Sequence, residues 1–216
     1  MNVLAIDTCG ALGTVALARL KDGAEPDVLG QTEIPGKTYS AQLVPVIRDL
    51  LRHHGVASAE IEAIVVTSGP GSFTGIRIGL STVKGLAEAH SVPLLSISRL
   101  AVLAHKAGRS AAALDASRHE FYLRMEGGES LLSLPDFEQQ ATALGRDLAV
   151  CEASVQAVAA LAEVVEPPTA ADALRCVLPR LRAGDFDDPL ILDGNYLRRS
   201  DAEIFSKPAR VAVPEP

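Results

Sequence analysis

Apolar and polar positions recur with two distinct periods along the first half of the chain. Short apolar or alternating runs bounded by turn-forming residues predict β-strands, and longer runs with apolar residues three or four positions apart predict helices. The expected strands cover residues 3–7, 14–20, 28–34, 61–67 and 92–97, and the expected helices cover residues 40–54 and 73–90. Three meandering strands therefore precede strands that are linked through helices.

The second half of the chain repeats this scheme weakly. The elements expected there are a hairpin at residues 110–115 and 120–125, a strand at 147–151, helices at 99–108, 154–163 and 170–183, and an extended tail at 190–216. Because the strand and helix order is that of an RNase H-like layer, we expect two such layers. We place an N-terminal subdomain at residues 1–98 and a smaller C-terminal subdomain with the tail at residues 99–216.

Composition and charge restrict the class of protein. Of the 216 residues 48% are apolar, so we expect a core that folds without disulfides. The three cysteines form no CxxC pair, which favours buried thiols in a reducing cytoplasm. Met1 runs straight into an expected strand and no apolar run approaches the roughly 20 residues that span a bilayer, so we expect neither an export signal nor membrane contact. The net charge of −7 disfavours nucleic-acid binding by this chain alone.

A glycine-rich stretch, SGPGSFTGIRIGL at residues 68–80, lies between an expected strand and an expected helix. Free amides at the start of a helix attract anions, so a phosphate-binding loop is one interpretation. The P-loop pattern fails because isoleucine instead of lysine follows Gly75, and the dinucleotide pattern fails because Thr74 stands where its last glycine is needed. Anion contact is therefore a minor hypothesis, with Gly71 and Ser72 as its candidates.

The helix expected at residues 73–90 has two faces that avoid charge. One face carries large apolar residues, and the other carries Ile78, Thr82, Gly85 and Ala89. A surface helix normally buries a single stripe, and a glycine inside a helix costs about 1 kcal/mol relative to alanine. Close approach of another backbone offsets that cost. Two interpretations stay open, tight packing within the same domain or an interface with a second subunit.

Residues suited to catalysis are sparse. No two histidines stand four apart, no HExxH occurs, and no serine lies in a GxSxG turn, so neither a metal site nor a hydrolase elbow is predicted. Asp7 ends the first expected strand before a hairpin turn, where it either caps the turn or contacts a ligand. We therefore predict no catalytic residue and no metal ligand, and we keep Asp7 as a weak anion-site candidate.

Five segments together resemble a known bacterial family. They read VLAIDT, SAQLVPVIRDLL, SGPGSFTGIRIGLSTVKGLA, LDASRHEFY and NYLRR, in the order of the family and across most of the chain, and the third is the most specific. The family is that of the tRNA threonylcarbamoyladenosine biosynthesis protein TsaB, also called YeaZ. The resemblance implies an α/β fold of the actin-like ATPase superfamily, with two RNase H-like subdomains of which the second is reduced.

The resemblance also implies a function. A paralogous enzyme, TsaD, transfers threonylcarbamoyl to the adenosine beside the anticodon of tRNAs that read ANN codons, and it carries the metal and nucleotide sites. The TsaB-type subunit is a non-catalytic dimerisation partner and scaffold, and an ATPase, TsaE, completes the assembly. By this resemblance the chain needs no cofactor of its own, meets tRNA only through the complex, works in the cytoplasm, and pairs with TsaD or with itself.

Family members associate through helices of the N-terminal half, the same region in which the expected helix at residues 73–90 carries its second uncharged face. The expected partner-interface residues are Val44, Leu51, Gly75, Ile78, Gly79, Thr82, Gly85 and Ala89. In actin-like ATPases a carboxylate at the place of Asp7 organises the metal and the phosphates. The chain departs from the family at Tyr39, where histidine is usual, and at Ser117, where arginine is usual, so the roles of those side chains in relatives are not carried over.

Two other functions are kept as alternatives. One is an enzyme on the same fold that acts by itself, either a small-molecule kinase or a glycoprotease-like enzyme. A kinase needs a second phosphate loop and an adenosine-binding glycine pair, for which Asp193 and Gly194 are the only late candidates, and a metalloprotease needs clustered ligands. The other alternative is a stand-alone homodimeric binding protein.

Overall fold

The first half of the chain forms a five-stranded sheet. The computed structural model describes residues 1–21 and 23–198. The strands are β1 (Asn2–Asp7), β2 (Leu12–Arg19), β3 (Asp27–Pro35), β4 (Ala63–Thr67) and β5 (Leu94–Ile97). They lie in the order β3-β2-β1-β4-β5, with β1 to β3 antiparallel and with β4 and β5 parallel to β1. Antiparallel neighbours need only a tight turn, whereas parallel neighbours need a crossover, and helices supply it here.

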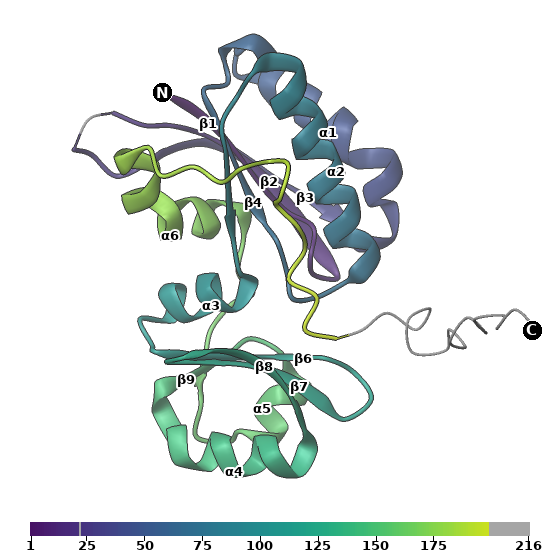
Figure 1. The fold of residues 1–216 in the computed structure, drawn as a ribbon, viewed down its shortest axis with the longest axis vertical. Helices are drawn as coiled ribbons and strands as arrows, with labels where there is room; N and C mark the ends of the chain where they lie inside the picture. The colour runs from purple at the N-terminus through teal and green to yellow at the C-terminus, as the bar shows by residue number, and fades with distance from the viewer. Residues whose placement is uncertain (22, 199–216) are drawn as a thin grey trace, which may run out of the picture.

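Helices cover both faces of this sheet (Figure 1). They are α1 (Tyr39–His53), α2 (Phe73–His90) and α6 (Ala170–Ala183). Successive side chains of a strand point to opposite faces, so Leu4 and Ile6 of β1 pack with α1 and α2 while Val3 and Ala5 pack with α6. This explains why β1 is buried from Val3 onward and reads as a continuous apolar run.

The second half of the described chain repeats this architecture. Its strands are β6 (Ala111–Asp115), β7 (Glu120–Met125), β8 (Gly128–Ser133), β9 (Leu148–Val150) and β10 (Glu163–Val164). Their order, β8-β7-β6-β9-β10, matches that of the first sheet strand for strand. The helices of this half are α3 (Arg99–Ala107), α4 (Leu134–Leu144) and α5 (Ala153–Val158). The fold is therefore α/β with two RNase H-like subdomains, and the short β9 and β10 make the second one smaller, as expected.

The two halves exchange helices. α3 follows the last strand of the first sheet but packs against β6, β7 and β9 of the second, and α6 follows the last strand of the second sheet but packs against the first. The two exchanged helices contact each other between the sheets, as Figure 1 shows. They bring the ends of β1 and β6 into one cleft, where the candidate site lies.

Most expected elements are present, and β8, α4 and β10 were missed. The helix predicted at residues 73–90 has those bounds, and the hairpin at 110–115 and 120–125 is confirmed as β6 and β7. β8 and α4 were not predicted, because β8 lies at the edge of its sheet, is only half-buried and opens on Gly-Glu-Ser, which has low strand propensity. The expected helix at 154–163 is shorter because the chain turns into β10.

The remaining described segments are short or irregular. Three 3-10 helices are η1 (Gly36–Thr38), η2 (Ser58–Glu60) and η3 (Gly145–Asp147). After α6 the chain runs to residue 198 without a helix or strand, and the rest of the expected tail, from residue 199, lies outside the described residues. Within the part of the chain that the structure describes, no helix has the length and apolarity needed to cross a membrane. The division at residue 98 stays a prediction.

Candidate functional site in the cleft between the two halves

Asp7 lies at the end of β1 and is almost fully buried. Its Oδ1 accepts the N–H of Cys9 at 2.8 Å, which caps the hairpin turn, and its Oδ2 lies 3.4 Å from Nε of Arg99. The side chains of Asp7 and Arg99 are 2% and 6% exposed. A buried charge needs a partner because desolvation is costly, so the carboxylate is held by a cation from this same chain. Turn capping by Asp7 is therefore present, whereas its part in an anion site stays a prediction.

Arg99 is the first residue of α3, behind its N-cap Ser98, and its backbone N–H donates to the Gly69 carbonyl at 2.6 Å. Burial lowers the pKa of Arg99, but the attraction of Asp7 outweighs it, so the guanidinium stays charged. Burial and the neighbouring Asp7 raise the pKa of the Cys9 thiol well above its ordinary value, so Cys9 is a neutral thiol.

The glycine-rich turn before α2 packs onto the first hairpin. Gly71 has φ of 151°, and a Cβ there would stand 2.3 Å from the Cys9 carbonyl oxygen, so the position requires glycine. The Ser72 N–H donates to that same carbonyl at 2.8 Å, and Ser72 Oγ accepts the Gly75 N–H at 3.2 Å as an N-cap. The amide of Ser72 is thus engaged by the chain itself. Anion contact at Gly71 and Ser72 stays a prediction.

Gly75 and Gly79 lie against Thr8 of the first hairpin. A Cβ on Gly75 would stand 2.0 Å from the Thr8 carbonyl oxygen, and one on Gly79 would stand 2.3 Å from Thr8 Oγ1, which donates to the Gly75 carbonyl at 2.8 Å. The close backbone approach inferred from these glycines is therefore made within the chain. Gly85 differs, since a Cβ there meets nothing within 4 Å.

The expected interface residues divide by exposure. Leu51, Gly75 and Gly79 are buried in the chain's own core, which corrects the idea that these three present surface to a partner. The other five are accessible: Val44 is 60% exposed, Gly85 and Ala89 are exposed, and Ile78 and Thr82 are half-buried. We call the surface formed by these five residues the accessible side of α1 and α2. That a partner binds there stays a prediction.

The two positions that depart from the family pattern have structural roles. The Tyr39 ring is buried against Gly13 and Gly75, and its hydroxyl donates to the Gly10 carbonyl at 2.8 Å. Burial, followed by the charge of Asp7, raises the pKa of Tyr39, so it stays a neutral donor. Ser117 begins a turn in which three consecutive non-glycine residues have positive φ, at 63°, 58° and 60°. This conformation is rare outside glycine and holds the β6–β7 hairpin in a particular shape.

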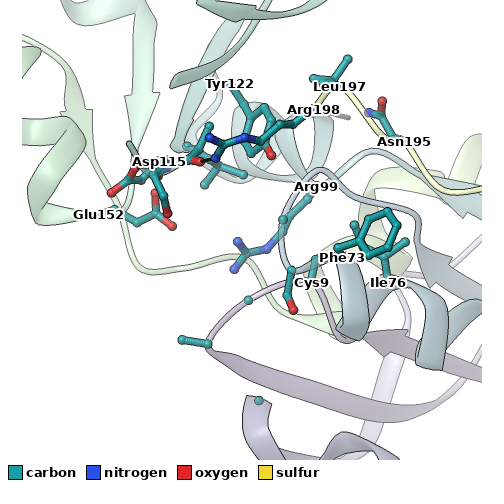
Figure 2. A pocket seen from close by; sticks show the side chains of 18 of the residues that line it. Cys9, Phe73, Ile76, Arg99, Asp115, Tyr122, Glu152, Asn195, Leu197 and Arg198 are labelled. Atoms are coloured by element: carbon teal, nitrogen blue, oxygen red, sulfur yellow. Dashed lines mark hydrogen bonds between the residues drawn. The ribbon is translucent and has the colours of Figure 1, made fainter. Parts of the chain in front are cut away.

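A cavity of about 990 Å³ separates the hairpins of the two halves. Figure 2 shows its walls. Phe73 and Ile76 of α2 and Tyr122 of β7 supply apolar surface, and Arg99 lies opposite Asp115 and Glu152. Both weak anion candidates of the glycine turn, Gly71 and Ser72, also line it.

The second hairpin carries two carboxylates on one wall of this cavity. Asp115 accepts the Ser117 N–H at 2.6 Å through Oδ1 and the Ser154 hydroxyl at 2.7 Å through Oδ2. Glu152 accepts the backbone N–H of Asp115 through Oε2. Burial raises the pKa of Glu152, and its hydrogen bond to the Asp115 amide and the charge of Arg99 oppose that rise. Glu152 of one half therefore lies within electrostatic reach of Arg99 of the other.

A strap formed by residues 185–198 closes one side of the cavity. Asn195 joins both halves, since its N–H donates to the Ser68 carbonyl at 2.7 Å and its Nδ2 donates to Glu129 Oε2 at 2.6 Å. Glu129 Oε1 accepts the Ser98 hydroxyl at 2.5 Å and Arg124 at 2.8 Å. Arg198, at the end of the strap, donates to the Ala116 carbonyl and pairs with Glu120 at 2.9 Å.

Sequence reasoning missed the roles of Arg99 and of the strap. One signal was available for Arg99, because it is the only charged residue in the otherwise uncharged run at residues 92–104. A lone arginine in such a run is buried only with a partner. The contacts of the strap join residues that are far apart in the chain, and no periodic pattern reports them. Among the described residues, no three histidine, cysteine, aspartate or glutamate side chains gather as a metal site does.

Comparison with known proteins shows which family the chain belongs to. A sequence model described as TsaD, tRNA N6-adenosine threonylcarbamoyltransferase, matches residues 32–170, from β3 to the start of α6. The chain belongs to the TsaD family. Its cleft and its α2 turn both fall largely within the matched region.

Relatives within this family support the resemblance to TsaB. The chain is 34% identical over 128 residues to the tRNA threonylcarbamoyladenosine biosynthesis protein TsaB of Escherichia coli, an alignment that covers 56% of the chain. It spans about half the length of that relative, 53%. Two solved structures from Pseudomonas aeruginosa are similar over nearly the whole chain. The first is described as having similarity to peptidase YeaZ, with a TM-score of 0.73, 28% identity, and coverage of 91% of this chain and 99% of that one. The second, described as YeaZ, has a TM-score of 0.70, 27% identity, and coverage of 90% and 100%.

Proposed function

We propose that the chain is a non-catalytic subunit of the assembly that makes threonylcarbamoyladenosine in tRNA. It binds a TsaD-type catalytic subunit and holds it in an active form, and a TsaE-type ATPase joins the same assembly. ATP, the metal and tRNA are bound by those partners, in the cytoplasm. Support comes from the match to the TsaD family and from relatives that are named as TsaB.

The observation that carries the non-catalytic role is the buried ion pair of Asp7 and Arg99. In this chain the carboxylate at the end of β1 is neutralised by a guanidinium that is 6% exposed. For Asp7 to serve a metal or phosphate ligand, Arg99 has to leave a buried position, which leaves one charge without its partner. The arrangement suits a protein whose first hairpin is a structural element.

The partner surface that we propose is the accessible side of α1 and α2. It contains Val44, which is 60% exposed, and the half-buried Ile78 and Thr82, next to the open position Gly85. Small residues on this side allow a partner helix to approach closely. The same surface serves self-association when the catalytic partner is absent, so the two modes compete for it.

Assembly tests this surface directly. The chain is mixed with the TsaD-type protein of the same organism, and the complex is sized by chromatography with light scattering. We expect Ile78→Glu to abolish co-elution, because a desolvated charge at an interface costs several kcal/mol. Ile78 also packs on the core of the chain, so the assay is run at a temperature below the unfolding midpoint of the variant. The matched control is Gln139→Glu, which adds the same charge on exposed α4 of the second half and is expected to leave co-elution unchanged.

Two outcomes contradict the proposal in different ways. If Ile78→Glu co-elutes with the partner as the unchanged chain does, the surface is wrong. If the chain alone, supplied with ATP, tRNA and a threonylcarbamoyl donor, produces modified adenosine, the non-catalytic role is wrong.

A further inference from the structure

The cavity between the two halves holds opposite charges that face each other without touching. Figure 2 shows the Arg99 guanidinium directed toward the side where Glu152 and Asp115 lie. All three side chains line the same cavity, and the charges of Glu152 and Arg99 influence each other. In the described part of the chain, however, no ion pair or hydrogen bond joins Arg99 to either carboxylate. A gap between complementary charges can hold a ligand that carries both a negative and a positive group.

The Arg99 side of the gap has hydrogen-bond donors to offer. A guanidinium carries five N–H donors, and among the described residues the side chain of Arg99 makes one hydrogen bond, from Nε to Asp7 at 3.4 Å. Its two amino groups thus find no acceptor in the described protein. They lie against Gly10, whose missing side chain leaves room for them, since a Cβ there would stand 2.6 Å from one of the amino nitrogens. A carboxylate is the acceptor that fits two such amino groups best.

The opposite wall has acceptors to offer. Oε2 of Glu152 accepts the Asp115 amide, which leaves Oε1 for a donor in the cavity, and the Asp115 carboxylate lies on the same wall. Two neighbouring carboxylates favour a cation between them. The other cationic side chain that reaches this hairpin from the strap, Arg198, is engaged by Ala116 and Glu120. The wall therefore suits an ammonium group.

The rest of the cavity is large and mostly apolar. Its volume of about 990 Å³ leaves space beside the charged gap, bounded by Phe73, Ile76 and Tyr122. Two aromatic rings of this wall are already ordered, since Phe73 packs on Tyr196 with ring centroids 5.0 Å apart and Arg77 lies over Phe73. A ligand with a bulky apolar body buries area there.

We propose that this cavity binds a small zwitterion, a free α-amino acid with a large apolar side chain. Its carboxylate lies on the amino groups of Arg99, its ammonium group on Glu152 and Asp115, and its side chain on Phe73 and Ile76. The wall of Glu152 and Asp115 repels a polyanion such as a nucleoside triphosphate, whereas Lys37, Arg118 and Arg198, which also line the cavity, attract one, so ATP is the competing ligand that the test has to separate. This inference goes beyond the scaffold role and stands independently of it.

Calorimetry on the isolated full chain tests the proposal. The probe is L-phenylalanine, and two analogues each lack one charge, 3-phenylpropanoate without the amine and 2-phenylethylamine without the carboxylate. Because each charged end contributes its own contact, we expect L-phenylalanine to bind at least about tenfold more tightly than either analogue. Inorganic phosphate and ATP are titrated separately, and both are expected to bind more weakly than L-phenylalanine.

Variants locate the ligand. Glu152→Gln keeps an oxygen for the Asp115 amide but removes the charge, so the affinity for L-phenylalanine is expected to fall to that for 3-phenylpropanoate, while the affinity for 3-phenylpropanoate itself does not fall. Glu138→Gln on exposed α4 is the matched control and is expected to change nothing. Arg99→Lys keeps the charge but loses the paired amino groups of the guanidinium. It is expected to weaken the binding of both ligands that carry a carboxylate, L-phenylalanine and 3-phenylpropanoate.

The proposal is overturned by any of three results. They are no binding of L-phenylalanine at millimolar concentration, equal affinity for the single-charge analogues, or tighter binding of ATP. A loss of binding in Glu152→Gln counts only if its unfolding midpoint matches that of Glu138→Gln. None of these measurements uses partners or tRNA, so failure here is distinct from failure of the scaffold role.

Discussion

At the scale of single residues, the glycines of α2 serve two different purposes. Gly75 and Gly79 are needed because Thr8 occupies the space of a side chain, whereas Gly85 faces open space. The sequence alone marks all three as unusual in a helix interior, but it does not reveal which backbone comes close. That information comes from the β1–β2 hairpin, which is more than sixty residues away in the chain, as the 67-residue separation of Thr8 from Gly75 shows.

Alanine substitutions separate these two purposes. Gly79→Ala places a methyl group 2.3 Å from Thr8 Oγ1, and we expect a loss of about 1–3 kcal/mol in the free energy of unfolding. Gly85→Ala adds a methyl group in open space, and we expect a gain of about 0.5–1 kcal/mol from the lower entropy of the unfolded chain. Urea denaturation of both variants measures these changes. Equal effects at the two positions contradict the packing described here.

The buried pair of Asp7 and Arg99 is the second feature at this scale. Removing one partner leaves the other charge buried, so we expect Arg99→Met to destabilise the fold by about 3–5 kcal/mol. The double variant Asp7→Asn with Arg99→Met removes both charges, and we expect it to recover a large part of that loss. A double-mutant cycle by chemical denaturation measures the coupling. Additive losses in the double variant would show that the two side chains do not depend on each other.

At the scale of elements, periodicity identified the helices and strands that bury one regular face. α2 and the β6–β7 hairpin were predicted well because each has a buried side with a helical or alternating repeat. β8 and α4 escaped because β8 has no fully buried residue and α4 buries only Phe137 and Ala141. The strap has no repeat at all. It is held by isolated polar contacts, and Asp187 provides several of them.

Asp187 fixes the start of the strap to β5 and α6. Its Oδ2 accepts the N–H and the hydroxyl of Ser96 at 2.6 and 2.8 Å, and its Oδ1 lies 2.6 Å from Arg180. Burial raises the pKa of Asp187, but the hydrogen bonds from Ser96 and the charge of Arg180 outweigh it and hold the pKa below the ordinary value of 3.8. A lowered pKa means that Asp187 stabilises the fold above pH 3.8 and that this contribution is lost as the pH falls below it.

The strap anchor therefore predicts a pH-dependent difference. At neutral pH we expect Asp187→Asn to lose about 1–2 kcal/mol, in the range of hydrogen bonds to charged groups. As the pH falls below 3.8 and through the lowered pKa of Asp187 in the folded state, the unchanged chain also becomes protonated at Asp187, so the stabilities of the two proteins are expected to converge. Denaturation at a series of pH values from 7 downward follows this. A difference that stays constant, or that grows in acid, contradicts the role given to Asp187.

At the scale of the whole molecule, two copies of one strand order exchange their last helices and enclose a cleft. The architecture of the first half was predictable, because its strands and helices are long and periodic. The cleft was not, because its walls come from the two hairpins, from α3 and from the strap, which only the tertiary structure brings together. A buried ion pair occupies one side of the cleft, and the accessible side of α1 and α2 lies outside it.

The central claim is that the chain activates a catalytic partner and does no chemistry itself. Nucleoside mass spectrometry of tRNA tests it most directly, after incubation with ATP, a threonylcarbamoyl donor and the purified TsaD-type and TsaE-type proteins, with and without this chain. We predict abundant threonylcarbamoyladenosine when all three proteins are present, much less when this chain is omitted or carries Ile78→Glu, and none from this chain alone. Equal yields with and without the chain, or modified adenosine from the chain alone, would contradict the claim.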